Sequence, residues 1–109
     1  MTQNTEKHEP EEIIIEIIEI EEYAKIGKVI PRGKKYQIRI DKIKYVVHVE
    51  SMTGRELLTL AGKIPVEKYR LDQKMKGGHT RKIELNQIVS FVEPGVERFM
   101  TLPLDQTEG

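Results

Sequence analysis

The chain has no cysteine, and its 109 residues include few aromatic side chains and no long apolar run. Without cysteine, disulfides, thiolate metal sites and cysteine nucleophiles are all excluded. No stretch approaches the roughly 20 apolar residues that a membrane-spanning helix needs. The first ten residues are polar and lack the apolar stretch of a secretory signal. We therefore expect a cytoplasmic protein with one domain and an arm or a tail.

The net charge of the chain is zero, but the charges are unevenly distributed. Residues 1–24 hold eight acidic side chains and one lysine, a net charge of −7. The whole chain has 18 basic and 18 acidic side chains, so residues 25–109 hold 17 basic and 10 acidic ones, a net charge of +7. This asymmetry indicates an acidic arm on a basic body.

Six isoleucines lie within the eight residues from Ile13 to Ile20 of the acidic arm. Apolar side chains at positions 13, 17, 20 and 24 recur at helical spacing, which predicts a helix over residues 13–24. Isoleucine itself favours strands, because its β-branch restricts χ1 in a helix. The segment from Gly27 to Gly33, which contains Pro31, has the composition of a linker.

The basic body begins with the pattern of a β-hairpin followed by a helix. Apolar side chains at positions 36, 38 and 40 alternate with polar ones, and a turn over residues 41–44 leads to a second strand over residues 45–49. Thr53-Gly-Arg-Glu56 is a capping box, in which Thr53 and Glu56 each satisfy a backbone N–H of the other. A helix of two to three turns is expected to follow and to end at Gly62.

The rest of the body predicts further strands. Residues 69–73 alternate as a third strand, residues 76–79 form a turn, residues 83–89 contain a short strand, and residues 96–102 form a final strand that Pro103 ends. The order ββαβ(β)β is typical of an α+β β-grasp domain. The predicted core consists of Ile38, Ile40, Val47, Val49, Leu57, Leu60, Ala61, Leu71, Leu85, Val89 and Phe99.

Several motifs in this body resemble those of the bacterial multiubiquitin family, and the resemblance covers roughly residues 22–109. The motifs are Lys35-Tyr-Gln-Ile-Arg-Ile-Asp41, Thr53-Gly-Arg-Glu-Leu-Leu58, Tyr69-Arg-Leu-Asp-Gln73, and Gly95-Val-Glu-Arg-Phe99 through Thr101-Leu-Pro-Leu-Asp105. The resemblance implies a ubiquitin-like β-grasp domain and a protein that is not itself an enzyme. It also implies E1-like, E2-like and JAB-type peptidase partners, and operons linked to conjugation and to antiphage defence.

On this resemblance we expect three parts: residues 1–33 form the acidic arm and linker, residues 34–103 the ubiquitin-like β-grasp domain, and residues 104–109 a conjugation tail. The predicted function is a protein modifier. A partner E1-like enzyme would activate the carboxylate of Gly109 with ATP, and an E2-like protein would transfer it to a target, so the chain itself needs no cofactor. The tail residues predicted to contact E1, E2 or peptidase are Leu104, Asp105, Gln106, Thr107 and Glu108.

The end of the chain departs from ubiquitin, which ends in Gly-Gly after a basic tail. This chain ends Gln106-Thr-Glu-Gly109 and carries two acidic side chains in its tail. A terminal glycine still suits the narrow channel of an adenylating enzyme, because a backbone without Cβ can approach closely. The alternative is an ordinary terminus, with a function as a non-covalent β-grasp interaction or scaffold module. The Gly77-Gly78 pair is expected to be a turn, because cleavage there would remove the last strand.

The isoleucine-rich arm is expected to contact protein. Burying one isoleucine side chain is worth about 1.5–3 kcal/mol, so exposing six together would be costly. The arm either packs against its own domain, or docks onto another copy or a conjugation enzyme by helix in groove or by strand addition. The residues predicted for contact with a partner or for self-association are Ile13, Ile14, Ile17, Ile18 and Ile20.

No catalytic or metal site is predicted. His8, His48 and His79 fall in the arm, a strand and a loop without shared ligand spacing, and we find neither a nucleophile paired with a base nor a phosphate-binding loop. Nucleic-acid binding is a further alternative, because lysine-rich stretches can contact phosphates. However, aromatics make up only 6% of the chain and the acidic arm would compete, so a solvated lysine face is the better interpretation.

Overall fold

A computed structural model of the chain describes residues 17–33 and 35–104. Two α-helices lie within these residues, α2 (Ile20–Lys25) and α3 (Gly54–Leu60), together with the 3-10 turn η2 (Val66–Lys68). The strands are β1 (Ile17–Glu19), β2 (Lys35–Ile40), β3 (Ile43–Val47), β4 (Ser51–Thr53), β5 (Tyr69–Met75), β6 (Thr80–Ile83), β7 (Ile88–Ser90) and β8 (Val96–Pro103). The predicted helix, third strand and final strand are confirmed. The predicted hairpin is present, but its turn covers only residues 41–42 and its second strand begins two residues earlier than predicted.

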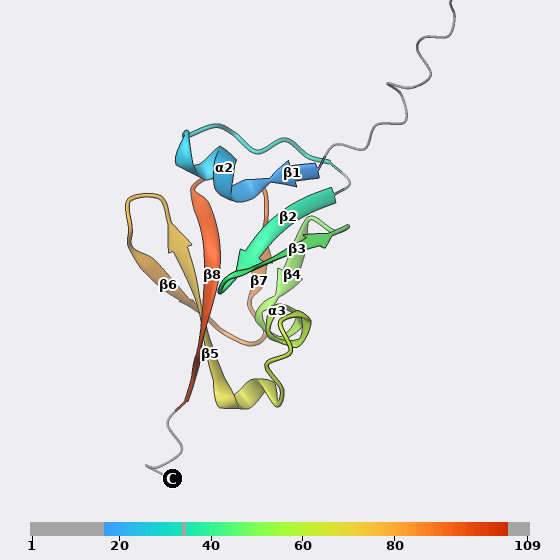
Figure 1. Cartoon of the computed structure of the whole chain (residues 1–109), viewed down its shortest axis with the longest axis vertical. Helices are drawn as coiled ribbons and strands as arrows, with labels where there is room; N and C mark the ends of the chain where they lie inside the picture. The colour runs from blue at the N-terminus through green and yellow to red at the C-terminus, as the bar shows by residue number, and fades with distance from the viewer. Residues whose placement is uncertain (1–16, 34, 105–109) are drawn as a thin grey trace, which may run out of the picture.

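A mixed six-stranded sheet carries the fold (Figure 1). Strand β2 pairs antiparallel with β3 on one edge, and on its other edge pairs parallel first with β1 and then, at Ile40, with β8. Strand β5 pairs antiparallel with both β8 and β6, so that β2, β8, β5 and β6 follow one another across the sheet. This compact mixed α/β arrangement is consistent with a ubiquitin-like fold.

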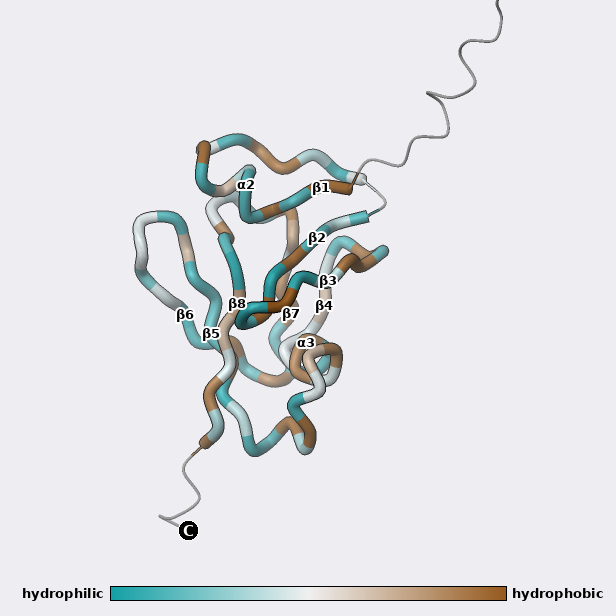
Figure 2. The backbone as a smooth tube through the Cα atoms, viewed as in Figure 1, coloured by the Kyte–Doolittle hydropathy of each residue, from teal (hydrophilic) through white to brown (hydrophobic). Residues whose placement is uncertain are grey.

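The hydrophobic core lies between the sheet and α3 with the small β4–β7 ladder. Apolar residues follow α3 in Figure 2, whereas the β5–β6 hairpin is mostly polar. Leu57 and Leu58 of α3 are both fully buried. Phe91 packs between Tyr36 and Phe99, with its ring centroid 6.2 Å from the first and 6.4 Å from the second.

Both ends of α3 have the local structure that the sequence predicts. The Thr53 hydroxyl accepts from the Glu56 N–H at 3.1 Å, and the Glu56 carboxylate accepts from the Thr53 N–H at 2.8 Å. Beyond the helix, Gly62 has φ +75°, and its N–H and that of Lys63 donate to Thr59 and Leu58. This is a Schellman ending, which fixes the direction in which Lys63 leaves the helix.

The helix predicted over residues 13–24 is wrong at residues 17–19, which form strand β1, and right at residues 20–24, which lie in α2. Residues 13–16 lie outside the described residues. The β-branched isoleucines favour a strand where a pairing edge is present, and β2 offers one: Ile17 pairs with Lys35 and Glu19 with Gln37. Ile18 and Ile20 are buried against the same sheet.

The segment between α2 and β2 is anchored to the domain at two points, although most of its residues are exposed. The Tyr36 hydroxyl accepts from the Gly33 N–H at 2.7 Å and donates to the Pro31 carbonyl at 3.3 Å. Ile30, within the same segment, is only 3% exposed. The core that the rest of the domain forms therefore includes Ile18, Ile20 and Ile30 of residues 17–33, while the division of the chain at residue 34 stays a prediction.

The predicted core is correct for seven residues and wrong for Val49, which lies beyond the end of β3 and is 48% exposed. Leu60, Ala61 and Leu85 are partly buried and pack against the core. The buried apolar residues that the sequence pattern missed are Ile18, Ile20, Ala24, Ile30, Tyr36, Leu58, Val66, Met75, Ile83, Phe91 and Val96. Several of these belong to the N-terminal segment, whose position against the sheet depends on long-range pairing.

A partly buried ion pair joins α2 to the outer face of the sheet. The Arg39 guanidinium donates to both carboxylate oxygens of Glu21, at 2.7 and 2.8 Å from Nη2, and Lys25 lies 3.5 Å away. Burial is the largest influence on Glu21 and alone would raise its pKa. The hydrogen bonds and charges of Arg39, with those of Lys25, together outweigh it, so the pKa of the Glu21 carboxyl lies below its usual value.

The Glu21→Gln variant is expected to lose about 1–3 kcal/mol of stability at neutral pH, between the values for exposed and for buried pairs. Because the pKa of Glu21 is lowered by folding, its contribution is full well above pH 4.5 and is lost as pH falls through the lowered pKa. Urea unfolding of both proteins across acidic pH measures this. The free energies of unfolding of the two proteins should become equal at low pH. A difference between them that does not change with pH would contradict the lowered pKa of Glu21.

Candidate functional site

The turn between β2 and β3 is fixed to the last strand by one aspartate. Asp41 has φ +57°, a left-handed conformation that aspartate tolerates better than most residues. Its carboxylate accepts from the Thr101 N–H at 2.8 Å and from the Thr101 hydroxyl at 2.6 Å, and its own N–H donates to the Phe99 carbonyl. The hairpin tip is thereby held against β8, two residues before Pro103 ends that strand.

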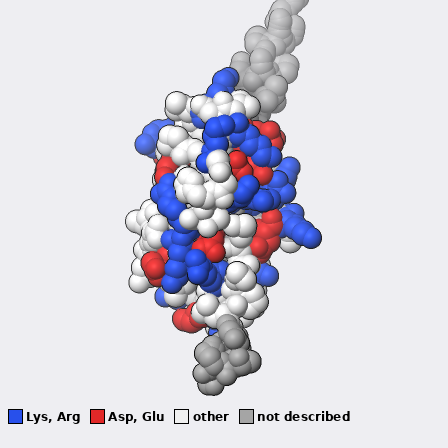
Figure 3. Space-filling view, turned by 90° about the vertical axis from the view of Figure 1, so that its left-hand side faces the viewer, with Lys and Arg blue, Asp and Glu red and all other residues white. Residues whose placement is uncertain are grey.

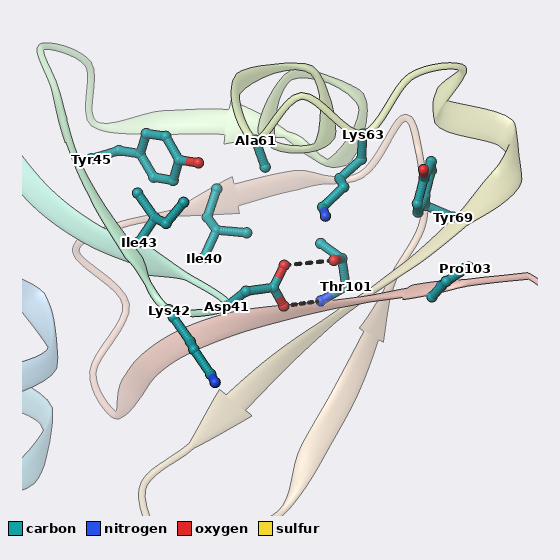
Figure 4. A pocket seen from close by; sticks show the side chains of 10 residues that line it. All are labelled: Ile40, Asp41, Lys42, Ile43, Tyr45, Ala61, Lys63, Tyr69, Thr101 and Pro103. Atoms are coloured by element: carbon teal, nitrogen blue, oxygen red, sulfur yellow. Dashed lines mark hydrogen bonds between the residues drawn. The ribbon is translucent and has the colours of Figure 1, made fainter.

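A cavity of about 480 Å³ lies beside this contact, between the hairpin and the chain that follows α3 (Figure 4). Ile40 and Ala61 contribute apolar surface, Ile43 and Tyr45 of β3 line one side, and Tyr69 lies at the other. The lining thus combines apolar surface and two phenol groups with the ammonium groups of Lys42 and Lys63 and the carboxylate of Asp41, a mixture of apolar and polar groups that is typical of binding sites.

Lys63 is one of three charged residues that line this cavity, with Asp41 and Lys42. The Schellman ending of α3 directs the residue toward the cavity, and Figure 4 shows its ammonium pointing inward. The ammonium lies 5.8 Å from the centroid of the Tyr69 ring, a cation–π contact. Within residues 17–33 and 35–104 no carboxylate forms an ion pair with Lys63. Since the Asp41 carboxylate is engaged by Thr101, the ammonium of Lys63 is the group in the cavity that can meet an acidic group of a ligand.

Lysine and arginine side chains also gather on the side of the molecule that carries the β5–β6 hairpin (Figure 3). Here the charges are mostly matched: Lys74 lies 3.4 Å from Glu97, and Arg81 lies 2.9 Å from Glu93. Acidic and basic side chains alternate over this surface in Figure 3. Such interspersed pairs favour a solvated face over a nucleic-acid interface.

The tail begins at the end of β8. Leu104 is 44% exposed, and its backbone N–H donates to the Lys68 carbonyl at 2.8 Å. It also lines a second cavity, of about 190 Å³, with Leu58 and Leu85. The other predicted tail residues, Asp105, Gln106, Thr107, Glu108 and the terminal Gly109, lie outside the described residues, so their roles stay predictions.

The predicted contact residues of the arm divide into two sets. Ile18 and Ile20 are buried in the core of this chain, at 4% and 0% exposure, as the alternative of packing against its own domain expects. Ile17 is 44% exposed, whereas Ile13 and Ile14 lie outside the described residues. Contact of this group with a partner stays a prediction.

Within the described part of the chain, no group of three His, Asp or Glu side chains could hold a metal ion. Likewise, no described helix is both long and apolar enough to cross a membrane. His48 and His79 are exposed and lie apart, and the Gly77-Gly78 pair forms the turn between β5 and β6, as predicted. The sequence identified Asp41 only as a turn residue, and its contact with Thr101 had no local signal.

Comparison with known proteins gives one match. Residues 36–103 match the family described as multiubiquitin. No curated protein and no solved structure matches the chain. The match begins at the second residue of β2 and ends at the last residue of β8, so it covers the sheet from its first hairpin to its final strand.

Proposed function

Since the chain belongs to the multiubiquitin family, we propose that it is a ubiquitin-like protein modifier whose Gly109 carboxylate is activated by a partner E1-like enzyme and passed through an E2-like protein to a target. The observation that carries this proposal is the family match, which ends where the predicted tail begins. Ubiquitin-like proteins are generally modifiers rather than enzymes.

The arrangement of the sheet supports the β-grasp fold that such a modifier needs. The hairpin β2–β3 is followed by α3, and the final strand β8 returns to lie parallel to β2 between β2 and β5. Asp41 ties that final strand to the hairpin tip at Thr101. A firmly held last strand suits a modifier, because partner enzymes can bind the domain while the residues after Pro103 extend into an active site.

The proposed chemistry uses only the terminal carboxylate of this chain. The carboxylate attacks the α-phosphate of ATP, which forms an acyl-adenylate and releases pyrophosphate. A thiolate of the E1-like or E2-like partner then attacks the acyl carbon, and AMP leaves. A target amine or hydroxyl finally displaces the thiolate. A JAB-type peptidase would cleave the bond between the Gly109 carbonyl and the target by hydrolysis.

The full chain should form an acyl-adenylate when it is incubated with ATP and a partner E1-like enzyme of the kind that this proposal requires. The expected readout is exchange of labelled pyrophosphate into ATP that depends on the chain, with a covalent adduct of the E1-like enzyme detected by intact-mass spectrometry. An active E1-like enzyme that accepts another ubiquitin-like substrate, but neither adenylates nor binds this chain, would contradict the proposal.

The second candidate is a non-covalent interaction or scaffold module. The observation that favours it is the cavity of Figure 4, with its inward-pointing Lys63. Binding of partner proteins without any covalent adduct in the presence of ATP would favour the scaffold over the modifier.

A further inference from the structure

Strand β3 forms one edge of the sheet, and among the described residues only β2 pairs with it. Its turn to β2 has two residues, so Ile40 and Ile43 form a hydrogen-bonded pair and the pairs alternate along the strands. Lys44 and Val46 therefore direct their N–H and C=O groups away from β2. These groups are ready to pair with an additional strand.

This edge is more apolar than an exposed edge usually is. Ile43 and Val46 are 58% and 45% exposed. The opposite edge strand, β6, presents the charged and exposed Arg81 and Lys82 instead, as edges that avoid pairing commonly do. The side chains thus favour pairing at β3.

The two faces of β3 differ in what they would offer to an added strand. On the inner face, Ile43 and Tyr45 line the cavity of Figure 4. On the outer face, Lys44 lies next to Val46 in the alternation. Neither Lys44 nor its neighbour Lys42 forms an ion pair with any described carboxylate, and the same holds for Lys63 of the cavity. An acidic, isoleucine-rich strand would match both faces.

We propose that the β3 edge binds residues 12–16 of a second copy of this chain as an added strand. In an extended strand, Ile13 and Ile15 face one side, and Glu12, Ile14 and Glu16 face the other. The first set meets the apolar inner face of β3 beside the cavity. The second set meets the outer face, where Ile14 can lie against Val46 and a glutamate beside Lys44.

The occupant is a second copy because the same chain cannot reach. Ile17 pairs with Lys35 on the edge of β2 opposite to β3. With strands about 4.8 Å apart, a strand added to β3 lies roughly 14 Å from β1. Four extended residues span at most about 14 Å, so residues 13–16 of the same chain would be used up in crossing the sheet. The isoleucines of another copy face no such limit.

A charge exchange in the full chain tests this proposal. Sedimentation velocity over a micromolar concentration series should show association of the wild type that weakens as salt is raised. The Lys44→Glu variant should associate at least about tenfold more weakly, because it places like charges together. Combining it with Glu12→Lys and Glu16→Lys should restore association. Lys28→Glu makes the same charge change at an exposed lysine of the segment between α2 and β2 and should have no effect.

Hydrogen exchange locates the interface independently. The amides of Lys44 and Val46 should become protected as concentration rises, and they should stay unprotected in a variant with serine at positions 13, 14 and 15. A wild type that stays monomeric, with both amides exchanging freely at every concentration, would overturn the proposal. So would association that survives the serine substitutions, because the interface would then lie elsewhere.

Discussion

Truncating Leu57 to alanine is expected to remove about 2–5 kcal/mol from the free energy of unfolding. Leu57 is fully buried in α3 and belongs to the cluster that packs against the sheet. The loss combines the transfer free energy of the removed atoms with the cost of the cavity that remains. Since a whole domain is stabilised by only about 5–15 kcal/mol, the variant should be partly unfolded well below the melting temperature of the wild type.

Leu60 of the same helix supplies the matched control. Its side chain is only partly buried at the margin of the core, so Leu60→Ala should cost less than about 2 kcal/mol, below the range for buried leucine. Urea unfolding followed by far-UV circular dichroism measures both variants on the same scale. Equal midpoints for the two variants would contradict the burial of Leu57 and the position of α3.

Local patterns in the sequence predicted much of the fold, because these patterns arise from interactions between residues that are close in the sequence. Alternation along β2 and β5 reflects one buried face, and the capping box of Thr53 and Glu56 is complete within four residues. What the patterns missed depends on long-range contacts. Strand β1 exists because β2 offers a free edge to Ile17, and Phe91 is buried because it packs between two distant aromatic rings.

The candidate site was less predictable for the same reason. The contact of Asp41 with Thr101 spans 60 residues, and the turn pattern around Asp41 says nothing about which strand lies beside it. No sequence pattern distinguished Lys63 from the other lysines. Its place in the cavity follows from the Schellman ending of α3. The tail, in contrast, was predicted from the resemblance and from its terminal glycine, and that prediction depends on chemistry rather than on packing.

Deleting Gly109 is expected to abolish both adenylate and conjugate formation in the assay with the E1-like enzyme. The deletion leaves glutamate as the last residue, and its side chain would obstruct a channel that accommodates a backbone without Cβ. Appending one residue to Gly109 should have the same effect, because the terminal carboxylate would no longer lie where the E1-like enzyme activates it. The melting temperature should not change in either variant, since glycine has no side chain to bury.

The Glu108→Gln variant is the control for these two changes, because it alters the tail next to the terminal glycine but keeps that glycine in place. It should retain adenylate formation, whereas the deletion and the extension lose it. Intact-mass spectrometry of the reaction with ATP distinguishes the three, and circular dichroism verifies that each is folded. If the chain without Gly109 still forms covalent conjugates, the reactive carboxyl group is not that of Gly109, and the modifier would have to react through another residue.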